Sequence, residues 1–139
     1  MKAILIYPKA RNGFWNGQKA IRRYLPRQKT ALPPYGLLTV ASMLPKEWEK
    51  KLVDLNVEKL TDEHIEWADV VLISAMISQS KSTLEIIKRC KKRYKIIMAG
   101  GALFNEPEKF PEVDYIFIGE AENTLPRFLK DLEKGTTKR

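Results

Sequence analysis

The 139-residue chain lacks several features on which common classes of protein depend. Its one cysteine, Cys90, can form no internal disulfide and cannot by itself hold an iron–sulfur cluster or a Cys-rich zinc site. No apolar run approaches the roughly 18 residues that a membrane-spanning helix requires. The patterns G-x-G-x-x-G and G-x-x-x-x-G-K-[ST] are also absent, which leaves dinucleotide and P-loop sites without their phosphate cradle.

The composition that remains is typical of one soluble globular domain. Hydrophobic residues make up 44% of the chain and charged residues 30%, and the length suffices for one sizeable core. The first apolar stretch, residues 3–7, is short and is followed by no small-residue cleavage site, so it predicts a strand and not a signal peptide. We therefore expect a cytoplasmic protein.

Positive charge is concentrated near the N-terminus. Residues 1–46 contain nine basic and no acidic residues, whereas the other 93 residues contain 16 basic and 17 acidic ones. Most of the excess lies between Pro8 and Pro34, in a segment without a clear helix or strand pattern that also contains Trp15. This segment indicates either a surface for an acidic partner or a solvated loop. It lacks the interleaved aromatic and basic residues of RNA-binding modules, so nucleic acid is not the expected partner.

Apolar runs rich in β-branched residues alternate with segments of helical period. The predicted strands are residues 3–7, 51–55, 70–74, 95–99 and 114–118. The predicted helices are residues 35–44, a short turn capped by Thr61, a helix capped by Ser80 or Ser82 that buries Leu84, Ile87 and Cys90, and residues 122–133. The alternation predicts a single doubly wound, flavodoxin-like (Rossmann-like) α/β domain, with a five-stranded parallel sheet in the order 2-1-3-4-5.

In such a sheet, ligands bind outside the carboxyl ends of the strands. Three of these ends carry small or polar residues: the serine-rich segment 74–82, the pair Gly100 and Gly101, and the pair Gly119 and Glu120. Each has a structural alternative, namely helix capping, a tight turn or acidic residues at a helix start. Their coincidence at one edge predicts a site for a large flat ligand. We assign no residue a catalytic or metal-binding role, and we expect His64 at the surface or in a cap and Cys90 in the core.

A set of ordered motifs carries a family resemblance. The motifs are MKAILIYP (1–8), FW (14–15), LPPYGLLTVA (32–41), VDLNV (53–57), WAD (67–69), ISAMISQ (73–79), AGG (99–101) and GEAE (119–122). Together they resemble the N-terminal cobalamin-binding (B12-binding) domain of cobalamin-dependent radical S-adenosylmethionine (radical SAM) proteins, and most closely the hopanoid-methylase-like branch. The resemblance extends from residue 1 to about residue 135.

The resemblance implies that a corrin ring lies over the carboxyl ends of the strands, with its nucleotide tail entering the sheet edge. The cofactor-binding residues that it implies are Tyr35, Gly36, Ser74, Met76, Ile77, Ser78, Gln79, Gly100, Gly101, Gly119 and Glu120. Other cobalamin domains carry D-x-H-x-x-G after the first strand, where the histidine ligates cobalt, but residues 8–13 here contain neither aspartate nor histidine. The resemblance therefore implies base-off, His-off binding, with residues 76–79 facing the lower side of cobalt.

In the resembled family a second domain holds a [4Fe–4S] cluster on a C-x-x-x-C-x-x-C motif and binds S-adenosylmethionine, and one cysteine cannot supply that motif. We expect residues 1–135 to be the cobalamin-binding domain and residues 136–139 to begin a linker to the absent radical SAM domain of the same chain. The resemblance implies that the full-length protein is a methyltransferase or a related radical enzyme. The basic 8–34 loop would then cover the cofactor or dock the barrel of the second domain.

Two other interpretations stay open from the residues alone. The first is a flavodoxin-like regulatory or interaction module that binds an acidic protein or RNA through the basic 8–34 loop. The second is a domain that binds flavin mononucleotide.

Overall fold

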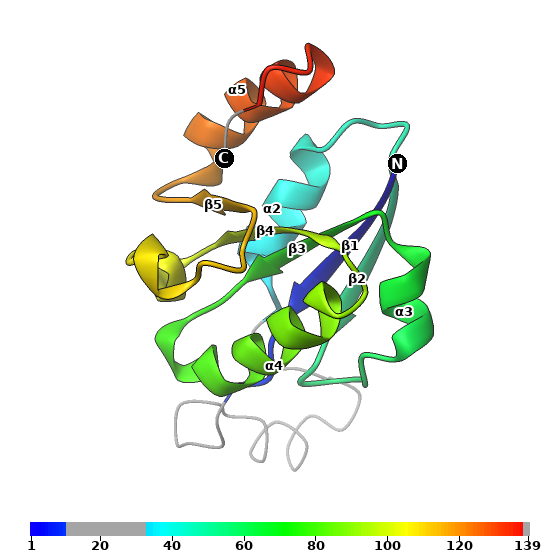
Figure 1. Ribbon diagram of the computed structural model, residues 1–139, viewed down its shortest axis with the longest axis vertical. Helices are drawn as coiled ribbons and strands as arrows, with labels where there is room; N and C mark the ends of the chain where they lie inside the picture. The colour runs from blue at the N-terminus through cyan, green and yellow to red at the C-terminus, as the bar shows by residue number, and fades with distance from the viewer. Residues whose placement is uncertain (11–32, 138–139) are drawn as a thin grey trace.

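Five parallel strands form one sheet in the order β2-β1-β3-β4-β5 in the computed structural model, which describes residues 1–10 and 33–137. The strands are β1 (Lys2–Tyr7), β2 (Glu49–Asp54), β3 (Val70–Ser74), β4 (Ile96–Gly100) and β5 (Tyr115–Phe117). The strand order and the parallel pairing confirm the flavodoxin-like fold expected from the sequence (Figure 1).

The strand boundaries differ most from the prediction at the two edges of the sheet. Strand β2 begins two residues earlier than expected, because its backbone pairs with β1 from Lys2 opposite Glu49 onward. The first four residues of β2 are exposed or half-buried, so its polar beginning carries no hydrophobic signal. Strand β5 has three residues in place of the five expected, because only the last three residues of β4 pair with it.

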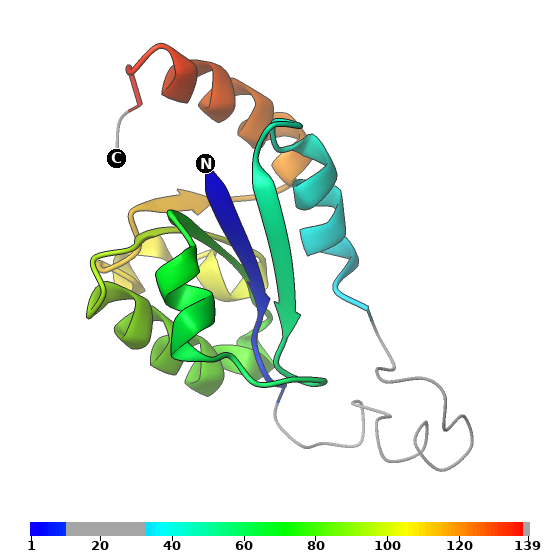
Figure 2. The same ribbon diagram turned by 90° about the vertical axis from the view of Figure 1, so that its right-hand side faces the viewer.

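Two layers of helices cover the sheet. Helices α2 (Tyr35–Met43) and α5 (Ala121–Glu133) lie on one face, and α3 (Asp62–Trp67) and α4 (Ser80–Lys91) lie on the other (Figures 1 and 2). The link from β4 to β5 contains only two 3₁₀ turns, η3 (Ala102–Phe104) and η4 (Pro107–Lys109). A further 3₁₀ turn, η2 (Ile77–Gln79), joins β3 to α4.

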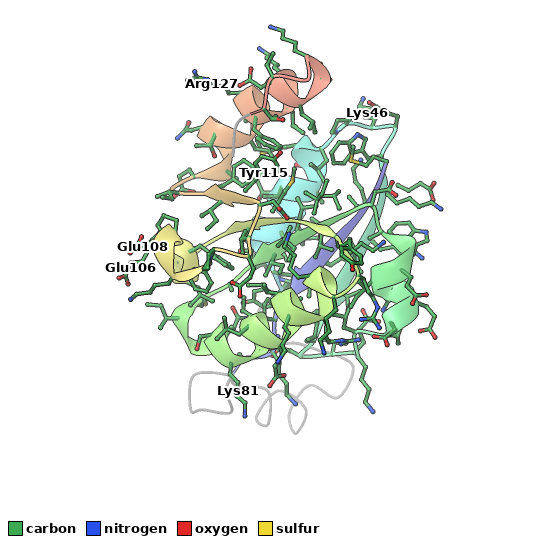
Figure 3. The ribbon with its side chains drawn as sticks, in the orientation of Figure 1. Lys46, Lys81, Glu106, Glu108, Tyr115 and Arg127 are labelled. Carbon is green, nitrogen blue, oxygen red and sulfur yellow. The ribbon has the colours of Figure 1, made fainter. Side chains whose placement is uncertain are left out.

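The two cores follow from the alternation of side chains along the strands. On β1, Ala3 and Leu5 point toward α2 and α5, whereas Ile4 and Ile6 point toward α3 and α4. Strands β1 and β3 are buried on both faces, which explains why their apolar runs are continuous. The core between the sheet and the helices α2 and α5 is called the α2/α5 core below. Tyr115 of β5, which is labelled in Figure 3, packs edge-on against Phe128 of α5 in this core, with ring centroids 4.8 Å apart.

The two predicted helix caps have opposite outcomes. Thr61 caps α3 as expected, because its hydroxyl accepts a hydrogen bond from the His64 backbone N–H while the Thr61 N–H donates to His64 Nδ1. The predicted cap of α4 by Ser80 or Ser82 is wrong. Gln79 occupies the cap position without a side-chain bond to the helix, and the Ser82 hydroxyl instead accepts a hydrogen bond from the Lys9 backbone N–H at 3.0 Å.

Two of the three residues predicted on the buried face of α4, Ile87 and Cys90, are buried, whereas the third, Leu84, is not. Thr83, Ile86, Ile87 and Cys90 are buried, but Leu84 is 52% exposed. Because successive helical residues are about 100° apart, Leu84 lies to the side of the stripe that the sheet covers. On α5, Leu125 is buried, and Phe128, Leu129 and Leu132 pack against the same core.

In the described part of the chain, no helix has the length and apolar character needed to span a membrane. Trp15 and six of the nine basic residues in the first 46 lie outside the described residues.

Candidate functional site

A cavity of about 210 Å³ opens at the carboxyl edge of the sheet, between β3, β4 and β5 and the helices α2 and α5. Its lining includes six of the residues singled out by the sequence, which are Gly36, Ser74, Gly100, Gly101, Gly119 and Glu120. These residues come from four separate segments. The topology therefore brings together the three strand ends that carry small or polar residues.

The inner end of this cavity is apolar. It is lined by Leu37, Leu72, Met98 and Leu125. Each of these residues belongs to the α2/α5 core and is at most 4% exposed. The outer rim is formed by half-buried or exposed residues, among them the hydroxyl-bearing Thr39 and Ser74 and the carboxylate of Glu120. The site thus combines an apolar inner end with a polar entrance, which is the usual design of a small-molecule pocket.

Gly101 forms a close contact in the cavity wall. Its φ of +93° lies in a region that L side chains rarely adopt, and a Cβ there would come within 2.8 Å of the Ala75 carbonyl oxygen. The same carbonyl accepts a hydrogen bond from the Leu103 backbone N–H, and the Ala75 N–H donates to the Gly100 carbonyl at 3.1 Å. The glycine therefore allows the segments after β3 and β4 to touch backbone to backbone.

Gly36 and Ser74 are neighbours in the cavity wall. A Cβ built on Gly36 would lie 4.0 Å from the Ser74 hydroxyl oxygen, which is ordinary van der Waals contact, and would meet no other described atom within 4 Å, so a side chain there could enter the cavity without a clash. Ser74 is half-buried at the end of β3, and its hydroxyl makes no hydrogen bond to another described residue.

The segment after β5 forms the third side of the entrance. Gly119 has a φ of +79° with no atom within 4 Å of where its Cβ would lie, and Glu120 is exposed at the cap position of α5. The Glu120 side chain makes no capping bond to the helix, although its backbone carbonyl accepts a hydrogen bond from the Thr124 hydroxyl.

The other predicted binding residues do not line this cavity. Tyr35, Met76 and Ile77 are exposed apolar side chains near the same edge, with 67%, 58% and 70% of their surface accessible. Ile77 and Ser78 line a second, broader hollow of about 940 Å³ beside the start of α4. The described residues around that hollow carry charges of both signs, and they include Lys9, Lys59, Lys81 and Arg89 as well as Glu58 and Glu85. Figure 3 shows Lys81 pointing away from the sheet.

Gln79 is buried, with 1% of its surface exposed, and both ends of its amide are used inside the protein. Its Nε2 donates to the Pro8 carbonyl at 2.6 Å and its Oε1 accepts from the Met76 backbone N–H at 2.7 Å. The side chain therefore joins η2 to the end of β1. It positions the segment 76–79 and has no amide group left for a ligand.

Asn56 is a second positioning residue, although its position in the sequence predicted no such role. Its Nδ2 donates to the Pro8 carbonyl and its Oδ1 accepts from the Ala10 backbone N–H. Asp54 supports it, because the Asp54 Oδ1 accepts from both the backbone and the side chain of Asn56, whereas Oδ2 is buried without a hydrogen-bond partner among the described residues. The only sequence feature that could have indicated this role is the polar pair Asp54 and Asn56 in the VDLN motif at the end of a predicted strand.

Tyr7 lies at the end of β1, opposite Asp54 in the neighbouring strand. Burial raises the pKa of its hydroxyl, a hydrogen bond with Gln79 opposes that rise, and the Asp54 carboxylate adds to it. The hydroxyl is therefore neutral at physiological pH.

The one histidine of the chain is used structurally, since His64 accepts a hydrogen bond from Thr61 in the cap of α3 and lines neither hollow. Over residues 1–10 and 33–137, no three His, Cys, Asp or Glu side chains gather as metal ligands would.

Comparisons with known proteins agree on one family. The profile described as "B12 binding domain" matches residues 27–129. A protein of Synechocystis named "uncharacterized methyltransferase" is 42% identical over 140 residues, covering 99% of this chain and 26% of that protein. The hopanoid C-2 methylase of Rhodopseudomonas palustris is 31% identical over 108 residues, covering 77% of this chain and 20% of that protein.

A second protein named "uncharacterized methyltransferase", from Pyrococcus horikoshii, is 28% identical over 148 residues, covering 97% of this chain and 30% of that protein. The chain therefore spans about a quarter of the length of the curated relatives that it matches. No solved structure matches it significantly.

Proposed function

The chain belongs to the B12 binding domain family, and from that premise we propose that it is the cobalamin-binding part of a longer, methyltransferase-like radical SAM protein. The observation that carries the proposal is the cavity at the carboxyl edge of the sheet, with its apolar inner end and its wall of closely packed glycine backbone. Bound there, cobalamin would supply a cobalt centre able to carry a methyl group to a substrate.

The size of the cavity matches one part of the cofactor. Sites that enclose a whole small molecule usually measure about 300–1,000 Å³, so 210 Å³ is too little for a corrin ring with its side chains. A cavity of about 150 Å³ holds one benzene ring, and the space here is larger by about the size of a second fused ring. We therefore assign the cavity to the nucleotide base of the tail, and the open edge above the strands to the corrin.

Named residues would hold these two parts. Ser74 would offer its free hydroxyl to the tail, and the backbone at Gly100 and Gly101 would let the tail pass close to the sheet. Gly119 and Glu120 would flank the tail where it leaves the cavity, with the Glu120 carboxylate accepting hydrogen bonds from amide or hydroxyl groups. Tyr35 and Gly36 would close the opposite side from the first turn of α2.

The cobalt would have no histidine ligand from this chain. His64 is held in the cap of α3, and the segment 8–10 after β1 contains no histidine and is fixed by Gln79 and Asn56. A base-off, His-off arrangement follows, with the exposed Met76 and Ile77 and the neighbouring Ser78 beneath the corrin. Gln79 contributes by positioning this segment and not by direct contact.

The remaining chemistry belongs to the rest of the longer protein. We propose that residues 1–135 form the cobalamin-binding unit and that residues 136–139 begin the connection to a radical SAM domain. That domain would bind S-adenosylmethionine and a [4Fe–4S] cluster, which the single buried cysteine of this chain cannot ligate alone. It would approach the cofactor over the exposed apolar side chains at the sheet edge.

A visible absorption spectrum of the chain, taken after incubation with hydroxocobalamin and desalting, tests the proposal. The expected result is a retained corrinoid with a base-off spectrum that changes little between neutral and acidic pH. Gly36→Trp fills the open space beside Ser74 without backbone strain and should reduce retention at least about tenfold. Ser42→Trp places the same side chain at an exposed position of the same helix and should retain the cofactor like the parent chain.

Two results would contradict this assignment. A folded parent chain that retains no corrinoid would argue against the binding function. Equal retention by Gly36→Trp and Ser42→Trp would place the cofactor elsewhere.

A further inference from the structure

Resting on the proposed function, we infer that the cavity selects corrinoids by the lower base, which is the nucleotide base of the tail. It favours a benzimidazole over a purine at this position. The inference starts from the groups at the inner end of the cavity. Leu37, Leu72 and Leu125 carry no polar side-chain atom there, and Met98 carries only a thioether sulfur, which is a weak acceptor. The strand backbone at Leu72 and Met98 is paired within the sheet. The inner end therefore offers no hydrogen-bond donor and no strong acceptor to a ligand.

The two classes of lower base make opposite demands on such a surface. A dimethylbenzimidazole presents carbon and two methyl groups along the edge remote from its sugar, and these match the leucine and methionine side chains. An adenine presents ring nitrogens and an exocyclic amino group along the same edge. Buried polar groups without partners are costly, whereas buried methyl groups are favourable.

The polar groups of the cavity lie at its entrance and do not change this balance. Thr39, Ser74 and Glu120 are half-buried or exposed, whereas the inner side chains are at most 4% exposed. The entrance can therefore bind the sugar and phosphate that both corrinoids share. Discrimination between the two bases therefore falls to the four inner side chains, Leu37, Leu72, Met98 and Leu125.

The experiment measures the affinity of the chain for three corrinoids: hydroxocobalamin, its adenine-containing analogue, and cobinamide, which has no nucleotide tail. The expected order is the benzimidazole form first, with the adenine form at least about tenfold weaker and cobinamide weaker still. Equal affinity for the two complete corrinoids, or tighter binding of the adenine form, would overturn the selectivity while leaving corrinoid binding intact. Cobinamide binding as tightly as hydroxocobalamin would overturn the placement of the base in the cavity. If none of the three corrinoids binds, the proposed function is contradicted as well.

A matched pair of variants localises the effect. Met98→Gln adds an amide at the inner end and should narrow the preference for the benzimidazole form at least about threefold. Met43→Gln makes the same change in the same α2/α5 core at a position that does not line the cavity, and it should leave the preference unchanged. If both variants shift the preference equally, the assignment to Met98 is wrong. Because the ratio in the parent chain is measured independently, the inference stays testable even where a variant folds poorly.

Discussion

At the scale of single residues, Gly101 and Gly119 look alike in the sequence but differ in what surrounds them. Both have positive φ, but a Cβ on Gly101 would meet the Ala75 carbonyl at 2.8 Å, whereas a Cβ on Gly119 would meet nothing within 4 Å. We expect Gly101→Ala to lower the free energy of unfolding by about 2–4 kcal/mol and Gly119→Ala by about 1 kcal/mol. Urea unfolding of the two variants checks this order, and equal losses would show that the contact with Ala75 relaxes at little cost.

Cys90 gives a prediction about pH. The thiol is fully buried, and burial raises its pKa from 9.0 to about 11, against a smaller opposing effect of the nearby Arg89 and other cationic side chains. Between these two values the unfolded chain releases the thiol proton while the folded chain keeps it, so stability should fall as pH rises from about 9 to 11. Below pH 9 the thiol contributes no pH dependence.

The measurement is urea unfolding of the parent chain and of Cys90→Ala at pH 7.5 and pH 10.5. The variant is less stable at pH 7.5 because it leaves a small cavity, but it should lose less stability between the two pH values than the parent does. Equal losses of stability in the parent chain and in Cys90→Ala would mean that burial does not raise the pKa of the thiol in the folded chain. Slow reaction of the folded parent with a thiol reagent at pH 8 is the accompanying expectation.

At the scale of elements, most of the secondary structure could be predicted, because buried parallel strands and amphipathic helices leave strong patterns. The apolar runs of β1 and β3 predicted those strands closely. Edge strand β2 begins with polar residues, and the start of α4 is held by a buried glutamine, so neither boundary had a local signal. Thr61 was predictable because its capping bonds are made within four residues of the chain.

The Gln79 side chain holds the segment that leads into α4. Gln79→Ala removes the hydrogen bonds to the Pro8 carbonyl and the Met76 N–H, which lie in different segments. Because the Met76 N–H loses its partner and the Pro8 carbonyl keeps only the 3.3 Å hydrogen bond from Asn56 Nδ2, we expect the free energy of unfolding, measured in urea, to fall by about 1–3 kcal/mol. The neighbouring Ser78→Ala, at an exposed position, should change stability by less than about 0.5 kcal/mol.

The effect on binding separates Gln79 from the cavity residues. Because Gln79 only positions the segment 76–79, the variant should weaken retention of hydroxocobalamin without changing the preference among lower bases. A change in that preference would mean that Gln79 contacts the tail, in contradiction to its internal hydrogen bonds.

At the scale of the whole molecule, the topology determines how much of the site the sequence could reveal. Gly100, Gly101, Gly119 and Ser74 were predictable as one site, because parallel strands bring their carboxyl ends to one edge. The inner residues Leu37, Leu72, Met98 and Leu125 were not predictable as lining residues of the cavity, since in sequence they are ordinary core positions. The space beside them results from the packing of α2 and α5 over the sheet.

The same packing predicts that ligand binding stabilises the whole domain. The cavity is lined by α2, three strands and the start of α5, so unfolding of any of these elements destroys it. A ligand present at a hundred times its dissociation constant adds about 2.7 kcal/mol to the free energy of unfolding, which for 139 residues corresponds to a rise of about 9 °C in Tm. Hydroxocobalamin should give this rise with the parent chain and with Ser42→Trp, and little rise with Gly36→Trp. If Gly36→Trp is stabilised as much as the parent chain, the ligand binds outside the cavity, because a tryptophan beside Ser74 leaves no room for a two-ring base.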